Sequence, residues 1–291
     1  LSFKSQSGLE VNEMSTVMHL DSQKLRLDGL TLLTPATTLK TDSILIDHKQ
    51  YKGFRQPFRN LHFNIAILPS VIGLSDLSYL SKAFRDIPEQ HLTLSGHFRG
   101  AVNNLKGDRV QLGLGSQTEM LTDFSLDGLP DISKTFMYID VNHLYTGMQD
   151  MATINRFLPP GKKLELPESL SNLGRIRYKG NFTGFIDDFV AYGTLNTQLG
   201  EISTDLLIQP RQGSGLAMKG NLQTRNFNIG GLLNSPEKFG RFSMDIQVKG
   251  SIFKDHGFRA ETNGNIKKLE INKYNYQNIR LNGLLTNNKY D

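Results

Sequence analysis

The chain has 291 residues, of which 38% are hydrophobic and 21% are charged, with a net charge of +5 and neither cysteine nor tryptophan. The lack of cysteine excludes a disulfide framework and a thiolate metal site. The composition favours repeated β-structure one or two layers thick over a doubly wound α/β domain, because each strand then buries only one face. The basic residues are scattered along the chain, so we expect no nucleic-acid partner.

The N-terminal part of the chain alternates apolar and polar residues in four short segments. These segments are 9–20, 25–32, 38–46 and 61–67. Each is predicted to be a strand of one continuing sheet, because a period of two is typical of a half-buried strand. Within the second segment, Asp28-Gly29 indicates a tight turn or a β-bulge.

A first helical segment follows these strands. Ser75 is predicted to cap a helix that reaches Phe84, with Leu77, Leu80 and Phe84 on one apolar stripe. We expect the helices of this protein to cover the open apolar face of the sheet.

Two further helical segments occupy matching places later in the chain. Thr146 is predicted to cap a helix in which Met148 and Met151 share a stripe, and residues 230–238 form a shorter equivalent. The two methionines leave open a soft-metal site, but core packing is the favoured interpretation.

Glycine-marked strands at 173–208 set the pattern for the rest of the chain. Ile176 and Tyr178 alternate with Arg175, Arg177 and Lys179, which predicts an apolar face and a cationic face. A close copy lies at 92–105 and a looser one at 242–252, so the repeat is about 70 to 84 residues long and each unit must hold several hairpins. The recurring glycines are predicted to mark turns. They are Gly96, Gly100, Gly180, Gly184 and Gly250.

These patterns predict a mainly β, elongated and mostly antiparallel fold with a few short helices. We expect one continuous repetitive segment with approximate units 61–130, 131–210 and 211–291, and residues 1–60 continuing the sheet from upstream. The apolar strand faces are too extensive to stay open to water, so either the sheet folds onto itself or an apolar ligand fills it.

The sequence offers little support for catalysis. The seven histidines lie singly, without the spacing of a metal site, so no metal or other cofactor is expected. Gly113 and Gly115 could belong to a phosphate-binding loop, and Asp187-Asp188 could form a catalytic carboxylate pair. For both motifs, turn residues are the favoured interpretation. We therefore predict that the protein is not an enzyme.

Several motifs in fixed order resemble the translocation and assembly module TamB proteins of the Bacteroidota type, which are related to AsmA-like envelope proteins. The motifs lie at 180–195, at 128–131 with 166–170, and at 274–283, and the resemblance covers the chain from about Leu25 onward. It implies a periplasmic protein of a Gram-negative bacterium, anchored in the inner membrane and rolled from long antiparallel sheets into an open half-pipe. It also implies an outer-membrane β-barrel partner. Because the chain begins without methionine and ends in mid-pattern, we expect an internal fragment of such a protein.

The resemblance also implies an apolar groove for phospholipid or another acyl-chain ligand. Seven residues at strand spacing are expected to line it. They are Ile176, Tyr178, Phe182, Phe242, Met244, Ile246 and Val248. Two alternatives stay open: a scaffold that assembles outer-membrane or secreted β-proteins through an open strand edge, and a carbohydrate-binding or carbohydrate-cleaving β-solenoid, against which the absence of tryptophan counts.

Overall fold

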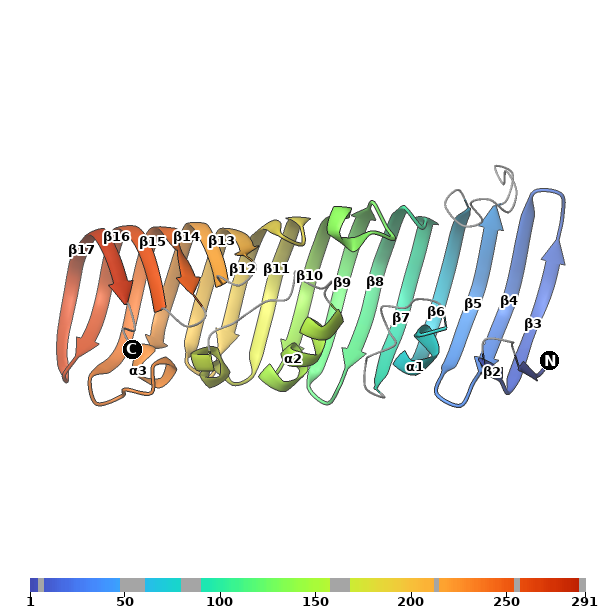
Figure 1. Ribbon diagram of the computed structural model, residues 1–291, viewed down its shortest axis with the longest axis horizontal. Helices are drawn as coiled ribbons and strands as arrows, with labels where there is room; N and C mark the ends of the chain where they lie inside the picture. The colour runs from blue at the N-terminus through green and yellow to red at the C-terminus, as the bar shows by residue number, and fades with distance from the viewer. Residues whose placement is uncertain are drawn as a thin grey trace. The chain divides into compact units, whose positions relative to one another are not determined.

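The computed structural model of the protein describes residues 1–4, 8–47, 61–79, 90–157, 168–211, 215–253 and 257–287. Fifteen strands, β3 to β17, form one open antiparallel sheet in which each strand lies beside the next one in the chain (Figure 1). The edge strands β3 and β17 do not pair with each other, so the sheet is not closed. The prediction of a mainly β, antiparallel fold with few short helices is confirmed.

The chain divides into two compact units, Leu1–Asn142 and His143–Asp291, which we describe separately. Strand β10 (Phe136–Thr146) runs through the division. The other elements of unit 1 are β1 (Phe3–Lys4), β2 (Glu10–Val11), β3 (Glu13–Leu20), β4 (Lys24–Leu33), β5 (Thr38–Asp47), β6 (His62–Gly73), α1 (Leu74–Leu77), β7 (His91–Ala101), β8 (Asn104–Leu114), β9 (Thr118–Asp127) and the 3-10 helix η2 (Ile132–Lys134). Strands β1 and β2 pair only with each other.

Unit 2 contains two α-helices, one 3-10 helix and the last seven strands of the sheet. They are α2 (Met148–Phe157), η3 (Glu168–Leu173), β11 (Ile176–Phe185), β12 (Asp188–Thr197), β13 (Gly200–Arg211), β14 (Gly215–Asn228), α3 (Ile229–Leu232), β15 (Phe239–Phe253), β16 (Gly257–Ile271) and β17 (Tyr274–Asn287).

The sheet of unit 2 has one apolar and one polar face. Residues directly opposite each other on neighbouring strands point to the same face. One such row is Phe182, Ala191, Leu206, Gly220, Val248 and Thr262. The adjacent row, on the other face, is Asn181, Tyr192, Asp205, Asn221, Gln247 and Asn263. We call these two surfaces the apolar face and the polar face.

Unit 1 shows the same division. Its apolar face includes the row Leu27, Ile44, Ile65, Phe98, Gly107 and Phe124. The row beside it, on the polar face, is Arg26, Leu45, Asn64, Arg99, Lys106 and Ser125. In unit 1, as in unit 2, successive residues of a strand thus point to opposite faces of the sheet.

Short helices cover one end of the apolar face of unit 2, as expected. Leu173, Ile176, Phe227 and Phe242 form a buried cluster there. The partly buried residues packed against the cluster come from α2, η3 and α3 as well as from strands, and include Met148, Leu170, Ile229 and Leu232. Met148 thus packs in the core.

Helix α1 corrects the prediction for residues 75–84. It spans only four residues, begins at Leu74, and is capped by the backbone of Gly73 with no side-chain hydrogen bond, so Ser75 lies inside the helix and is not its cap. The reason is local anchoring: Leu74 is 2% exposed, and Asp76 accepts a 2.6 Å hydrogen bond from the hydroxyl of Thr37. Leu80 and Phe84 lie outside the described residues.

The prediction that five recurring glycines mark turns is wrong, because Gly96, Gly100, Gly180, Gly184 and Gly250 all lie within strands. At Gly180 the reason is a close backbone approach. Its φ is +155°, and a Cβ there would lie 2.1 Å from the carbonyl oxygen of Tyr192 and 2.5 Å from Cα of Gly193. The hydroxyl of Tyr178 donates a 3.0 Å hydrogen bond to the same carbonyl, so the phenol ring covers the two glycines.

The buried phenol of Tyr178 predicts a loss of stability at high pH. Burial raises its pKa to about 12, whereas an unfolded tyrosine ionises near pH ~10. Between about pH 10 and 12 the unfolded chain therefore loses a proton that the folded chain keeps, and the free energy of unfolding falls. Urea unfolding across this range should show a smaller pH-dependent loss for Tyr178→Phe than for the wild type. Identical pH dependence in both proteins would contradict this assignment.

Candidate functional site

The apolar face of unit 2 is the most extensive candidate site. Its centre is a cluster of Leu206, Ile246 and Val248, which are 6%, 6% and 7% exposed. Partly buried side chains, among them Met218 and Leu222, surround this cluster. The described part of unit 2 has no second sheet over this face, so neighbouring side chains provide the cover.

All seven residues predicted to line a groove lie on this one face. Tyr178 and Met244 belong to one row of direct partners, through Leu195, Ile202 and Thr224. Phe182 and Val248 belong to a second row, and Ile246 lies opposite Leu222 between the two rows. Ile176 and Phe242 continue the alternation and meet in the cluster beneath the helices. The structure thus brings the seven residues together; that they contact a lipid stays a prediction.

Sequence reasoning missed much of the remaining apolar face. It did not assign Leu206, Met218 and Leu222 in unit 2, or the apolar row of unit 1. The signal was present, since these residues alternate with polar ones in the same way. The pairing register was needed to show that they share a face with the predicted residues.

A line of β-bulges crosses unit 1. Register shifts occur between β3 and β4, β5 and β6, β6 and β7, β7 and β8, and β8 and β9. They fall side by side, because Thr41, Ile67 and Gly96, which border three of them, are direct partners on consecutive strands. We call this series the bulge line. A bulge sets two residues against one and bends its strand, so every strand it crosses bends at a similar height.

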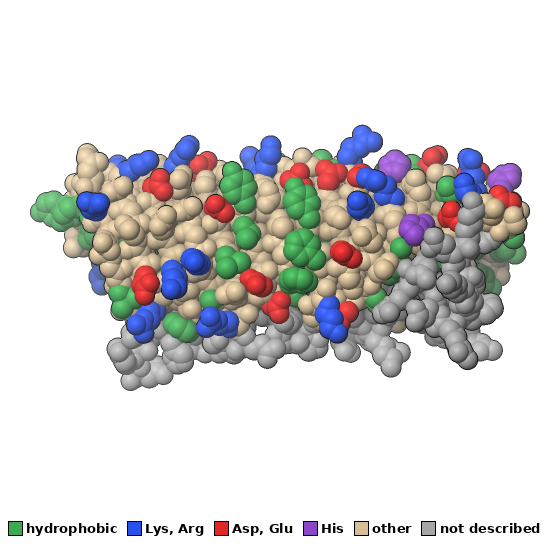
Figure 2. Space-filling model, turned by 90° about the horizontal axis from the view of Figure 1, so that it is seen from above, with side chains coloured by type: hydrophobic (Ala, Val, Ile, Leu, Met, Phe, Trp, Pro, Cys, Tyr) green, Lys and Arg blue, Asp and Glu red, His purple; other side chains and the backbone are tan. Residues whose placement is uncertain are grey.

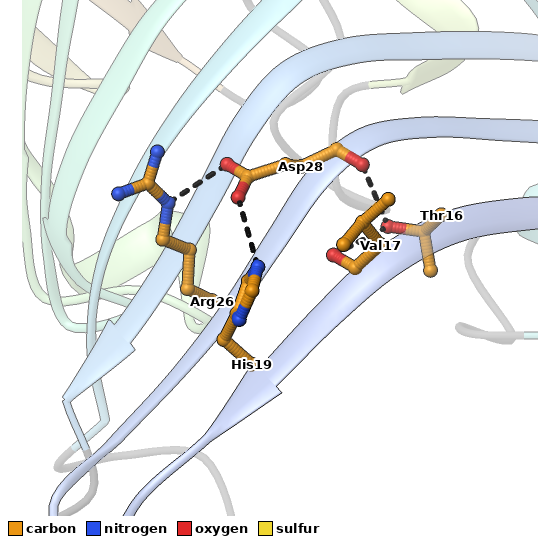
Figure 3. A network of polar contacts seen from close by, with 5 residues as sticks. All are labelled: Thr16, Val17, His19, Arg26 and Asp28. Atoms are coloured by element: carbon orange, nitrogen blue, oxygen red, sulfur yellow. Dashed lines mark hydrogen bonds and ion pairs between the residues drawn. The ribbon is translucent and has the colours of Figure 1, made fainter.

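Side chains satisfy backbone groups along the bulge line. The hydroxyl of Thr16 donates to the carbonyl of Asp28 at 3.1 Å, while the Asp28 carboxylate holds Arg26 at 2.8 Å and His19 at 3.8 Å (Figure 3). Ser70 accepts from the Lys40 amide at 2.9 Å. The contacts of Thr16 and Ser70 replace ladder hydrogen bonds that a bulge removes. Asp28-Gly29 therefore lies at a bulge, one of the two structures predicted for it.

Unit 2 has a bulge of the same design between β14 and β15. The register shifts between Thr224 and Phe227, and Asn226 takes a left-handed φ of +50°. The Ser243 hydroxyl accepts from the Asn226 amide at 2.8 Å. Phe227 and Phe242 meet edge to face beside it, with ring centroids 5.7 Å apart, so the bend adjoins the apolar face.

The residues considered for catalysis have structural positions. Gly113 pairs with Glu119 inside β8, and Gly115 lies in the turn after it with a φ of +62°. Asp187 lies in the turn before β12, and Asp188 accepts a hydrogen bond from Gln209 at 3.2 Å. Among the described residues, no three His, Asp or Glu side chains gather in a way that could hold a metal ion.

Arg99 and Asp108 form an ion pair on the polar face of unit 1. Nε of Arg99 donates a 2.8 Å hydrogen bond to the carboxylate of Asp108, which lowers the pKa of that carboxyl group. Both side chains are about half exposed, so solvent screens the pair. We assign it no chemical role.

Comparisons with known proteins leave the family open. No family model, no curated protein and no solved structure matches this chain. The resemblance to TamB proteins therefore rests on the sequence motifs. In the described part of the chain, no helix is long and apolar enough to cross a membrane.

Proposed function

We propose that the apolar face binds the acyl chains of phospholipids and forms one segment of a lipid conduit between the inner and outer membranes. The observation that carries this proposal is the single apolar face of unit 2, with at least one apolar residue on every strand from β11 to β17 and no second sheet among the described residues to cover it. Such a face needs an apolar companion.

The free energies are of the size that lipid transfer requires. Moving an acyl chain from a bilayer into water costs about 0.8 kcal/mol per methylene, or about 13 kcal/mol for sixteen carbons. A continuous apolar surface removes most of this cost, because the acyl chain then exchanges one apolar environment for another. Partly buried residues of the apolar face, such as Met218 and Leu222 on β14, provide that surface without a closed cavity.

The bulges support the half-pipe that we propose for this sheet. Strands that bend at matching heights turn one face inward, and side chains on an inward-turned face converge and cover one another. In unit 2, where the bulge between β14 and β15 bends the strands, Ile246 and Val248 have low exposure on a single-layered sheet. With the resemblance to TamB proteins, it favours a periplasmic, inner-membrane-anchored protein that works with an outer-membrane β-barrel.

Photo-crosslinking in cells tests the proposal. Crosslinkers at Met218 and Leu222 lie on the apolar face, and those at Asn221 and Gln223 lie on the polar face of the same strand. We expect lipid adducts at the first pair, because only these side chains point toward the bound acyl chain. Equal labelling of both pairs would refute a lipid site on this face.

A second candidate function is a scaffold for the assembly of β-barrel proteins. The observation that favours it is that β17 is an edge strand of the sheet among the described residues, with Tyr274 71% and Tyr276 49% exposed. An unpaired edge can accept a client strand through backbone hydrogen bonds. Both functions can coexist, because one uses a face and the other an edge.

A further inference from the structure

Four cations line a depression of about 390 Å³ on the polar face of unit 2. They are Arg211, Lys219, Lys249 and Arg259, and Glu261 is the only acidic residue among the lining residues. All five side chains are exposed. Figure 2 shows Lys and Arg side chains gathered around an acidic one at its lower left. We call this feature the basic depression.

The pairing register creates the basic depression from four neighbouring strands. Arg211 ends β13, Lys219 lies on β14, Lys249 on β15 and Arg259 on β16. Lys219 is the direct cross-strand partner of Lys249, and Lys249 is in turn the partner of Glu261. Arg259 belongs to the next row on the same face, two residues from Glu261.

This arrangement carries an uncompensated electrostatic cost. Direct cross-strand partners have Cβ atoms about 5 Å apart, and like charges placed in this way destabilise a sheet. One carboxylate faces four cations, and within the described residues no ion pair joins Glu261 to any of them. On the same face of unit 2, Arg225 by contrast forms an ion pair with Glu201 at 3.7 Å.

We infer that the basic depression binds a phosphate group. A phosphate dianion between Lys219 and Lys249 would replace their repulsion by attraction, and the planar guanidinium of Arg259 or Arg211 can bind two of its oxygens at once. Ala217 is 8% exposed and lines the depression together with Leu207 and Leu284. These apolar residues would contact the organic part of a phosphate ester or lipid headgroup. The site lies on the face opposite the proposed acyl-chain site, so the two proposals stand independently.

Calorimetric titration of the whole chain with inorganic phosphate and with glycerol 3-phosphate, at low ionic strength, tests this inference. We expect saturable binding of one equivalent, weakened by about tenfold or more in the double variant Lys219→Gln/Lys249→Gln, because two charge-assisted contacts are lost. The matched control is Lys179→Gln/Arg280→Gln, which removes the same charge from the polar face of unit 2 outside the basic depression. Its affinity should stay within about twofold of the wild type.

Thermal unfolding provides a second measurement. In phosphate-free buffer Lys249→Gln should unfold at the same or a higher temperature than the wild type, since one of two opposed cations is gone. Added phosphate should raise the unfolding temperature of the wild type and not that of the double variant. If both double variants lose affinity equally, or if no saturable binding occurs in any arm, the inference is overturned.

Vesicle co-sedimentation distinguishes the two sources of the phosphate group. Vesicles of phosphatidylglycerol present the phosphate group in an anionic lipid headgroup, and vesicles of phosphatidylcholine serve as the comparison. Retention on phosphatidylglycerol that depends on Lys219 and Lys249 supports a headgroup site. Binding of glycerol 3-phosphate with the same dependence, without retention on vesicles, supports a soluble phosphate ester.

Discussion

Gly180→Ala is expected to lower the free energy of unfolding by about 3 to 5 kcal/mol. Two effects act together at this position. The φ of +155° is one that only glycine adopts readily. A methyl group would also lie 2.1 Å from the carbonyl oxygen of Tyr192, because β11 and β12 approach closely where Gly180 lies directly opposite Gly193. Because the obstacle is backbone, no rotation of a side chain can relieve it. Urea unfolding followed by circular dichroism measures the change.

Two other glycines separate these effects. Gly29 has a φ of +60° and open space around its Cβ position. Gly29→Ala should therefore lower the free energy of unfolding only by the cost of the left-handed conformation, about 1 to 2 kcal/mol. Gly283 has open space and no positive φ, so Gly283→Ala should change stability by less than about 1 kcal/mol. If Gly180→Ala costs no more than Gly29→Ala, the close backbone approach is not what requires glycine at this position.

Leu222→Asp is expected to abolish most phospholipid binding while leaving the sheet folded. Leu222 is partly buried on the apolar face, directly opposite Ile246. A carboxylate there must keep its water or take up a proton, and either excludes an acyl chain. Leu222 is a better position than Ile246 itself, because Ile246 is only 6% exposed and an aspartate in its place would cost several kcal/mol of folding free energy. Native mass spectrometry of the purified protein reports the bound phospholipid.

The neighbouring residue provides the matched control. Asn221→Asp introduces the same carboxylate on the same strand, but on the polar face. It should retain the phospholipid that Leu222→Asp loses. Both variants leave the backbone of the edge strand β17 intact, so assembly of client β-barrels should continue in each. Undiminished phospholipid binding in Leu222→Asp would refute the acyl-chain site on this face and leave the scaffold as the primary candidate.

The strand faces could be predicted from the sequence because a period of two acts within each strand. Ile176 and Tyr178, or Ile246 and Val248, need only their own neighbours in the chain to be assigned to one face. The same local rule identified the first four strand segments of the chain. The core position of Met148 followed from a different local rule, because Met148 and Met151 share one stripe at helical spacing.

Apart from the bulge at Asp28-Gly29, the bulges could not be predicted in this way, and neither could the basic depression, because both depend on which residue lies opposite. Arg109 takes a φ of +48° where β8 shifts against β9, and no local motif marks it. Lys219 and Lys249 lie on different strands, and only the register makes them partners. Gly180 was assigned to a turn for the same reason, since the sequence does not show that Gly193 lies opposite.

The most direct test of the account is whether the wild-type protein binds phospholipid at all. Native mass spectrometry of the protein, purified from cell envelopes in mild detergent, should show adducts with the masses of membrane phospholipids. We expect these adducts because the apolar face of unit 2 has no second sheet over it in the described residues, and we propose that acyl chains cover it instead. A spectrum of folded protein without any lipid adduct would contradict the central claim that this face is a lipid-binding surface.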